Sequence, residues 1–351
     1  MSIQSATETK TRVIAADERG IRTAAEIIRA GGVVGMPTET VYGLGADAWN
    51  EKAVGRIFLA KGRPADNPLI VHIADPEMLG ELTEEVPDIA VLLMRAFWPG
   101  PMTLILKRKP CIPDIVTAGL STVGIRMPAG ATARALIREA RRPIAAPSAN
   151  TSGKPSPTTA QHVYRDLRGR IPLILEDGPC QFGVESTVID VSGGRPVILR
   201  PGAVTPEMIE ALGKRAVVDP HVLEPLGDGE TARSPGMKYR HYAPGARLTV
   251  YTGEKPKVAE KICLNYDESL RRGEKPVILG FDDQSYGMRR VYSLGDRNHP
   301  EISAARLFAA LRRMDDEKIT AGFAEALSLE GIGIAFMNRI GRASEFRIVH
   351  A

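Results

Sequence analysis

The sequence has little cysteine and no pattern that would pair its thiols or hold a metal with them. Cys111, Cys180 and Cys263 stand far apart in 351 residues, and no C-x-x-C occurs. Neither a zinc knuckle nor a disulfide framework is therefore indicated. The polar start, MSIQSATETKTR, lacks the apolar core of a signal peptide. Because no apolar run approaches the roughly 20 residues that span a bilayer, we predict a cytoplasmic protein without membrane contact.

Common catalytic and nucleotide-binding motifs are absent as well. The chain contains no G-x-x-x-x-G-K-[ST] phosphate loop, no H-E-x-x-H and no G-x-S-x-G. Gly43, Gly45 and Ala48 fit G-x-G-x-x-A, but no acidic residue is clearly placed about 20 positions further on, so this lone match is weak. A formal net charge of +4 is too small over this length to indicate a nucleic-acid binder.

What the sequence does contain is a succession of short strands and helices. Short β-branched runs such as LIVHI, MTLILK and STVIDV predict strands, and apolar periodicity predicts helices over 21–30, 51–60, 87–97 and 205–213. With many short strands and few helices, residues 1–213 are expected to form an α/β domain whose sheet is mixed.

A second, smaller unit is predicted near the C-terminus. Residues 214–245 contain four prolines and four glycines without periodicity, so we place a linker there. Strands alternate with helices over residues 246–351, and 300–316 is the strongest amphipathic helix of the chain. This pattern predicts a small Rossmann-like α/β domain.

The polar clusters of the first unit supply cations, hydroxyls and amides but no catalytic dyad. KGRPADNPL places Lys61 and Arg63 two apart, able to point the same way from an extended segment. APSANTSGKPSPT, ESTVIDV and ILRPGA add hydroxyls, turn backbone and Arg200. Together these groups suit a phosphorylated or carboxylated ligand.

Each cluster also has a purely structural interpretation. Serine and asparagine in PSANTSG can simply make turns, and Lys61 can be the charge at a helix C-terminus. His72 lies among apolar residues, where a satisfied core histidine is commoner than a ligand contact. Arg126 ends an apolar strand before a proline and needs an anionic partner, which is either an internal carboxylate or a ligand.

The polar clusters occur within a series of segments that resembles a known family. PTETVYGLGADA, KGRPADNPL, FWPGPMTLIL, STVGIRMP, APSANTSGKPSPT and GVESTVIDVSGGRPVILRPGAVT follow one another in order. They are similar to the signature segments of the YrdC-type threonylcarbamoyl-AMP synthases. SPGMKYRHYAP and a second unit ending in GIGIAFMNRIGRAS resemble the long, two-domain form. The resemblance implies a twisted mixed sheet surrounded by helices, with a concave, basic cavity.

The resemblance also implies a reaction and its partners. L-Threonine, bicarbonate or CO2, and ATP give L-threonylcarbamoyl-AMP, pyrophosphate and water. A downstream transferase complex then uses the product to modify adenosine 37 of transfer RNA, so the enzyme itself needs no stable nucleic-acid binding. Mg²⁺ is expected with ATP, held mainly by phosphate and water rather than by a protein carboxylate cage.

Site residues are carried over from the family motifs position by position. The resemblance implies that a K-x-R and S-x-N set grips nucleotide and intermediate: Lys61, Arg63, Ser148 and Asn150. Further residues are implied on the ATP side: Asn67, Thr122, Ser156 and Arg200. The threonine side is implied to comprise Thr40, His72, Arg126, Ala146 and Ser186. Arg126 suits a bidentate grip on the amino-acid carboxylate.

The linker segment SPGMKYRHYAP holds more cations and aromatic rings than a connection requires. Carbamates lose CO2 and acyl-adenylates hydrolyse, so the intermediate needs shelter from water. We interpret the segment as a closing lid in which Tyr239 and His241 approach the nucleotide and Lys238 or Arg240 its phosphates. The alternative is an ordered clasp between domains.

Two other functions are alternatives to the synthase. A double-stranded-RNA or tRNA-binding module would use a concave basic surface, but the modest net charge argues against it. A carbamoyltransferase of the hydrogenase-maturation type shares this kind of domain. It normally has zinc-finger cysteine pairs and an acylphosphatase module, which the sequence does not contain.

Overall fold

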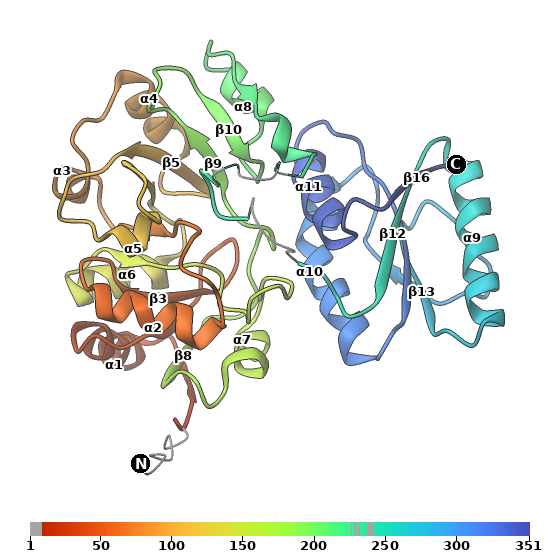
Figure 1. Ribbon diagram of the computed structural model, residues 1–351, viewed down its shortest axis with the longest axis horizontal. Helices are drawn as coiled ribbons and strands as arrows, with labels where there is room; N and C mark the ends of the chain where they lie inside the picture. The colour runs from red at the N-terminus through yellow and green to blue at the C-terminus, as the bar shows by residue number, and fades with distance from the viewer. Residues whose placement is uncertain (1–8, 226, 228–229, 231, 237–241) are drawn as a thin grey trace.

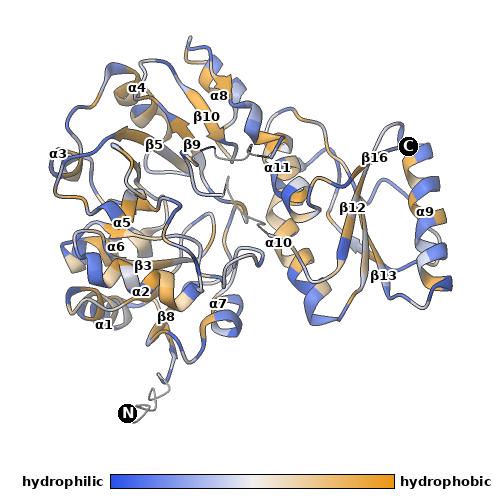
Figure 2. Cartoon of the chain, in the orientation of Figure 1, coloured by the Kyte–Doolittle hydropathy of each residue, from blue (hydrophilic) through white to orange (hydrophobic). Residues whose placement is uncertain are grey.

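Two β-sheets with their covering helices form the part of the chain that the computed structural model describes, which is residues 9–225, 227, 230, 232–236 and 242–351. Figure 1 shows the resulting two lobes side by side. In Figure 2 the strands of both lobes carry mostly hydrophobic residues, and hydrophilic residues gather in loops and on outer helix faces. No helix in these ranges has the length and apolar character needed to cross a membrane. The α/β fold class is confirmed.

The sheet of the larger lobe is mixed, as predicted. Among the described residues its strands lie in the order β1-β8-β2-β3-β7-β4-β6-β5-β9-β10-β11. Neighbours pair in both senses: β4 is parallel to β6, whereas β5 is antiparallel to β6. The strands are β1 (Arg12–Ala15), β2 (Val34–Met36), β3 (Gly43–Asp47), β4 (Ile70–His72), β5 (Met102–Lys107), β6 (Thr122–Arg126), β7 (Ile144–Ala145), β8 (Leu173–Glu176), β9 (Thr187–Asp190), β10 (Val197–Arg200) and β11 (Val217–Val218).

The helices of this lobe follow the periodicity read from the sequence, within a few residues. The helix predicted over 51–60 is observed as α2, and the one over 205–213 ends earlier, as the short α8. The helices are α1 (Glu18–Arg29), α2 (Glu51–Lys61), α3 (Leu79–Leu82), α4 (Asp88–Phe97), α5 (Asp114–Thr117), α6 (Ala131–Ala140), α7 (Ala160–Leu167) and α8 (Pro206–Glu210), with 3₁₀ turns over Pro76–Met78 and Pro220–Val222.

Local sequence explains both ends of α2. The Asn50 side chain accepts a hydrogen bond from the Ala53 amide at 3.1 Å, which caps the N-terminus. Gly62 takes the left-handed conformation (φ 61°) that ends the helix, and its amide bonds back to Leu59. Lys61 is therefore the last helical residue, and Arg63 lies beyond the turn.

The smaller lobe has a purely parallel sheet, which agrees with the Rossmann-like prediction. Within the described residues the strands lie in the order β14-β13-β15-β12-β16. The predicted helix 300–316 coincides with α10. The elements are β12 (Arg247–Thr252), α9 (Lys255–Arg271), β13 (Pro276–Gly280), β14 (Val291–Ser293), α10 (Pro300–Asp316), β15 (Ala321–Glu325), α11 (Gly333–Ala343) and β16 (Ile348–His350). The C-terminal residues, for which the sequence made no prediction, thus add an edge strand.

The two lobes touch through buried apolar and charged side chains. In Figure 1, α10 and α11 face the larger lobe and α9 covers the far side of the small sheet. Val41 and Val184 of the larger lobe belong to the hydrophobic core that includes Leu307 and Phe336. β11 pairs with β10, so the segment predicted as a linker contributes a strand to the larger sheet. The domain boundaries at 213 and 245 stay a prediction.

Candidate active site

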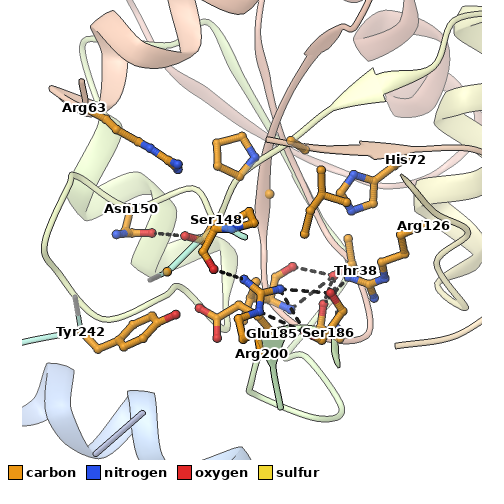
Figure 3. Close-up of a pocket in the computed structure, with 18 of the residues that line it drawn as sticks. Thr38, Arg63, His72, Arg126, Ser148, Asn150, Glu185, Ser186, Arg200 and Tyr242 are labelled. Atoms are coloured by element: carbon orange, nitrogen blue, oxygen red, sulfur yellow. Dashed lines mark hydrogen bonds between the residues drawn. The ribbon is translucent and has the colours of Figure 1, made fainter. Parts of the chain in front are cut away.

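A cavity opens in the larger lobe, where several strands end (Figure 3). It encloses about 660 Å³, its open mouth included. The described residues that line it come from segments far apart in the sequence: Thr38, Thr40, Val41, Gly43, Arg63, Ile70, His72, Arg126, Ala146, Pro147, Ser148, Asn150, Lys154, Glu185, Ser186, Arg200, Pro235, Gly236 and Tyr242.

Most of the predicted site residues meet in this cavity. Nine of them line it: Thr40, Arg63, His72, Arg126, Ala146, Ser148, Asn150, Ser186 and Arg200. Four others do not belong to its lining: Lys61, Asn67, Thr122 and Ser156. Tyr239 and His241, with Lys238 and Arg240, lie outside the described residues. In Figure 3, Arg63, Arg126 and Arg200 lie around one hollow although they come from different elements.

Lys61 and Arg63 do not belong to one extended segment, which corrects that expectation. Lys61 ends α2, and the left-handed Gly62 turns the chain before Arg63. The Lys61 Nζ is buried and donates to the backbone carbonyl oxygens of Ser148 and, at 2.5 Å, Asn150. Burial, and next the charge of Arg63, lower the pKa of Lys61 well below its usual value. Lys61 thus holds the loop that presents Ser148 and Asn150.

The loop that follows β7 combines turn-making and site roles. Ser148 Oγ donates to Asn150 Oδ1 at 2.6 Å, and Asn150 Nδ2 donates to the carbonyls of Thr151 and Lys154 at 2.8 and 2.9 Å. Asn150 therefore shapes the turn, as the structural interpretation proposed, and also borders the cavity. The turn-making interpretation is confirmed, and a ligand-binding role of Asn150 stays a prediction.

Asn67 and Ser156 lie behind the cavity wall. Asn67 is fully buried, and no described group hydrogen-bonds to its side-chain oxygen or nitrogen. Its backbone carbonyl accepts from Arg63 Nη2 at 3.0 Å. Ser156 Oγ donates to Glu185 Oε1 at 2.5 Å. Thr122 begins β6, opposite Lys107.

Arg126 finds the internal carboxylate that was one of its two expected partners. Its Nη2 lies 2.6 Å from Glu39 Oε1, with both side chains buried. Nη1 donates to Thr40 Oγ1 at 2.8 Å and Nε to the Gly100 carbonyl at 3.2 Å. Burial opposes ionisation of Glu39, but the Arg126 charge and the hydrogen bonds to the carboxylate together outweigh burial, so the pKa of Glu39 is lowered. Of the five N–H groups of a guanidinium, two have no described partner here.

His72 is neutral beside this pair. Burial, and next the positive charge of Arg126, lower the pKa of His72 to about 3. No described group hydrogen-bonds to its Nδ1 atom. A neutral imidazole can donate or accept one hydrogen bond at the cavity surface without adding charge.

Arg200 is buried without a carboxylate partner. Its Nε and Nη2 donate to the Ser186 carbonyl at 3.1 and 3.0 Å, and Nη2 also donates to Ser186 Oγ at 3.1 Å. Nη1 reaches the Pro235 carbonyl at 3.4 Å. Among the described residues, no acidic oxygen lies within 4.0 Å of this guanidinium, and burial lowers its pKa to about 10. Its hydrogen-bond partners are all neutral, although the charge of Glu185 partly offsets the effect of burial. A buried cation without a carboxylate hydrogen-bond partner favours an anionic ligand.

Comparison with known proteins assigns the family. A family model described as "Telomere recombination" matches residues 26–202, and one described as "Threonylcarbamoyl-AMP synthase, C-terminal domain" matches 204–345. The threonylcarbamoyl-AMP synthase of Pyrococcus abyssi is 48% identical over 333 residues, covering 95% of this chain and 96% of that protein. This chain belongs to the threonylcarbamoyl-AMP synthase family.

Further relatives agree with this assignment. The threonylcarbamoyl-AMP synthase of Bacillus subtilis is 47% identical over 347 residues, covering 97% of both chains. A crystal structure of P. abyssi Sua5 complexed with L-threonine has a TM-score of 0.92 and 47% identity, covering 98% of this chain and 100% of that one. The family predicted from the signature segments is confirmed, and the chain is an enzyme of the transferase class.

Sequence reasoning missed several residues in or beside this synthase-family cavity. Glu185 and Glu39 stand directly before Ser186 and Thr40, inside segments that had been singled out. The adjacent predicted site residues could have indicated both glutamates. The sequence does not show their ion pairs, because the partners, Arg126 and Arg339, are remote in the chain. Lys154 and Tyr242 also line the cavity.

Proposed function

We propose that the protein makes L-threonylcarbamoyl-AMP from L-threonine, bicarbonate or CO2, and ATP, with release of pyrophosphate and water. The observation that carries this proposal is the convergence of Arg63, Arg126 and Arg200 on one cavity with hydroxyl and amide groups. The family match spans both lobes of the chain, and the relatives named above carry this activity in their names. Neither the RNA-binding nor the carbamoyltransferase alternative has comparable support.

The required chemistry is charge neutralisation more than nucleophile activation. The threonine amine must become a carbamate, and a carbamate oxygen must attack the α-phosphate while pyrophosphate leaves. Two anions have to meet, so cations fixed in advance lower the barrier. Four cationic side chains line the cavity, Arg63, Arg126, Lys154 and Arg200, against one carboxylate, Glu185.

The threonine side of the cavity is assigned to Arg126 and its neighbours. Three N–H groups of Arg126 contact Glu39, Thr40 and Gly100. The other two could bind the carboxylate of L-threonine. The neutral His72 and the hydroxyl groups of Thr40 and Ser186 can receive the polar groups of the amino acid. Support comes from the relative solved with L-threonine, which shares the fold over 98% of this chain.

The nucleotide side is assigned to Arg200, Arg63 and the Ser148–Asn150 loop, with Ser156, Asn67 and Thr122 in support. Arg200 brings a buried positive charge to the position where a phosphate would be stabilised most. Lys61 contributes by fixing the loop from behind. Asn67 is buried behind the wall and contributes through its backbone carbonyl, which accepts from Arg63 Nη2 at 3.0 Å.

Mg²⁺ belongs to the ATP side of this proposal. In the described ranges no three His, Cys, Asp or Glu side chains gather as a metal site. Both Glu185 oxygens already accept hydrogen bonds, and Glu39 is paired with Arg126. These contacts fit an ion held by phosphate and water, where it would neutralise charge on the leaving pyrophosphate. We expect chelation by EDTA to stop pyrophosphate release.

The lid interpretation of residues 234–244 stays a prediction. Its central side chains are outside the described residues, but Gly236 before them and Tyr242 after them both line the cavity. Tyr242 packs against Phe308 of α10, with ring centroids 5.0 Å apart. These flanks support a segment that crosses from the larger lobe to the smaller one at the cavity. If Tyr239→Ala and His241→Ala left both ATP affinity and turnover unchanged, the lid would be excluded.

Omission of single components tests the proposal. The purified protein is incubated with ATP, L-threonine, bicarbonate and Mg²⁺, and pyrophosphate release is measured with each component left out in turn. We expect release to need all of them and the product to carry threonine and AMP. Release that is independent of threonine would overturn the assignment. In the cell, we infer, the product supplies a cytoplasmic transferase complex that modifies adenosine 37 of transfer RNA.

A further inference from the structure

One arginine of the smaller lobe reaches the back wall of the cavity. Arg339 lies on α11 and is fully buried. Its Nε donates to Glu185 Oε2 at 2.9 Å, its Nη1 to the Pro201 carbonyl at 2.8 Å and its Nη2 to the Glu185 carbonyl at 3.2 Å. Asn338 Oδ1 accepts a further bond from Nη1 at 2.8 Å. The guanidinium thus serves two backbone positions and one carboxylate of the other lobe.

Each of the acceptors in the larger lobe adjoins a residue of the proposed site. Glu185 precedes Ser186, and Pro201 follows Arg200. The second oxygen of Glu185 accepts from Ser156 Oγ at 2.5 Å, which brings in a third chain segment. Arg200 in turn donates to the carbonyl and hydroxyl oxygens of Ser186. Hydrogen bonds and directly adjacent backbone residues therefore link α11 to Arg200 in the cavity lining.

The charges along this path depend on Arg339. Glu185 lines the cavity and is buried, which opposes its ionisation. The charges of Arg339 and Arg200 outweigh burial and lower the pKa of Glu185 to about 2. Without Arg339 the Glu185 carboxylate would lose its ion-pair partner and would compete with an anionic ligand for Arg200.

Other contacts between the lobes differ from this one. Arg165 of α7 pairs with Asp316 of α10, but both side chains are about half exposed, at 48% and 49%, and neither lines the cavity. That pair joins the lobes without touching the site. It provides a matched control for a purely cohesive role.

We propose that Arg339 is a positioning residue: the smaller lobe uses it to hold Ser156, Ser186 and Arg200 in the arrangement that binds ATP and threonine. The inference rests on the proposed function and extends it, because it makes the smaller lobe part of the active site. Arg339 does not touch the reacting atoms; it acts through Glu185 and the Pro201 carbonyl.

The test compares Arg339→Lys, Arg339→Met and Arg165→Gln in the full-length protein. Lysine keeps the positive charge, but it lacks the planar guanidinium that lets arginine reach the Glu185 carboxylate and the two backbone carbonyls together. We expect Arg339→Lys to stay folded and to raise the Kd of ATP, measured by calorimetry, about 10- to 100-fold, which corresponds to one charged hydrogen-bond set. The KM for ATP should rise by a similar factor, with a smaller change in kcat. Arg339→Met should be worse, and Arg165→Gln should match the wild type in both constants.

The outcomes separate the inference from the function beneath it. A folded Arg339→Lys protein with wild-type Kd and KM would overturn the positioning role. If Arg339→Met does not fold, the positioning role is tested with Arg339→Lys and with the double variant Glu185→Gln/Arg339→Met. The double variant removes both charges and so leaves no buried carboxylate without a partner. Should the wild type release no threonine-dependent pyrophosphate, the proposed function fails. The Kd values for ATP and threonine still decide whether Arg339 positions a binding site.

Discussion

Two polar clusters lie where strands end, one in each lobe, and they differ in how their charges are balanced. In the smaller lobe, Glu325 ends β15 and Asp283 follows β13; together with Arg297, Lys255 and Tyr286 they form what we call the small-lobe cluster. Arg297 bonds to Glu325 and lies 3.2 Å from Asp283, and Lys255 lies 3.0 Å from Asp283. The hydroxyl of Tyr286 donates to Glu325.

The cavity of the larger lobe is not balanced in this way. Arg200 is buried there with carbonyl and hydroxyl partners only, among the described residues, and cations outnumber carboxylates along the lining. In the small-lobe cluster two cations meet two carboxylates, and each charge has an internal partner. The carboxyl edge of a parallel sheet is a common ligand position. The contrast shows that a position at the ends of strands does not by itself indicate a ligand site. A buried cation without a carboxylate hydrogen-bond partner is the more specific indication.

The largest effect is expected from removing the unbalanced charge. Arg200→Met should lower threonine-dependent pyrophosphate release about 10²- to 10³-fold, the usual loss when one preorganised donor is removed. Its free energy of unfolding should fall by about 1–3 kcal/mol, because the buried Ser186 carbonyl loses its donors and Glu185 loses a stabilising charge. Turnover per folded protein and urea unfolding check the two parts. Wild-type turnover in a folded variant would contradict the assignment of Arg200.

The opposite result is expected in the small-lobe cluster. Glu325→Gln removes a buried charge that Arg297 and Tyr286 both contact, so we expect the protein to lose about 1–3 kcal/mol of stability. ATP affinity per folded molecule should not change. Urea denaturation with calorimetry on the same preparation measures both quantities. A strong loss of ATP affinity at unchanged stability would show that the cluster is a ligand site after all.

Mild acid should weaken the cavity before the small-lobe cluster. The folded pKa of His72 is lowered to about 3 from 6.5, so the unfolded state binds the extra proton and stability falls as pH drops below 6.5. The expected slope is about 1.4 kcal/mol per pH unit. Burial opposes ionisation of Asp283, but bonds from Lys255 and Arg297 lower its pKa below 3.8, so its contribution is lost only in stronger acid.

Urea unfolding between pH 7 and pH 5 tests this difference. The His72→Gln variant should lose the slope that His72 contributes to the wild type. His299→Gln, at an exposed histidine of the smaller lobe, serves as the control and should keep the wild-type slope. An unchanged slope in His72→Gln would mean that His72 is not held neutral by the fold.

The smallest effect comes from two matched lysines. Lys154 lines the cavity and lies 3.6 Å from Asp166, whereas Lys255 lies 3.0 Å from Asp283; their side chains are 52% and 59% exposed. Each Lys→Gln change should alter stability by no more than about 0.5 kcal/mol, as for surface ion pairs generally. Only Lys154→Gln should raise the KM for ATP, by a few-fold. Equal KM values in both variants would place Lys154 outside the nucleotide site.

Prediction from sequence succeeded where structure depends on near neighbours. The helix at 300–316 and the helix after Asn50 follow from apolar spacing, a capping side chain and a left-handed glycine. The family segments also indicated most of the residues that meet in the cavity. The extended segment expected for Lys61 and Arg63 was wrong, because Lys61 is the last residue of α2 and the left-handed Gly62 turns the chain before Arg63.

The sequence by itself determined the helices, the mixed and parallel sheets and the identity of the family, since periodicity, caps and motifs act over a few residues. Only the tertiary structure decided that Glu39 pairs with Arg126, that Arg339 of the smaller lobe reaches Glu185, and that Arg200 is buried with the carbonyl and hydroxyl of Ser186 as hydrogen-bond partners. Such pairs join residues remote in the chain. The interaction free energy of such a pair arises only when the fold excludes water and brings the two groups together. No local sequence pattern therefore predicts the pair.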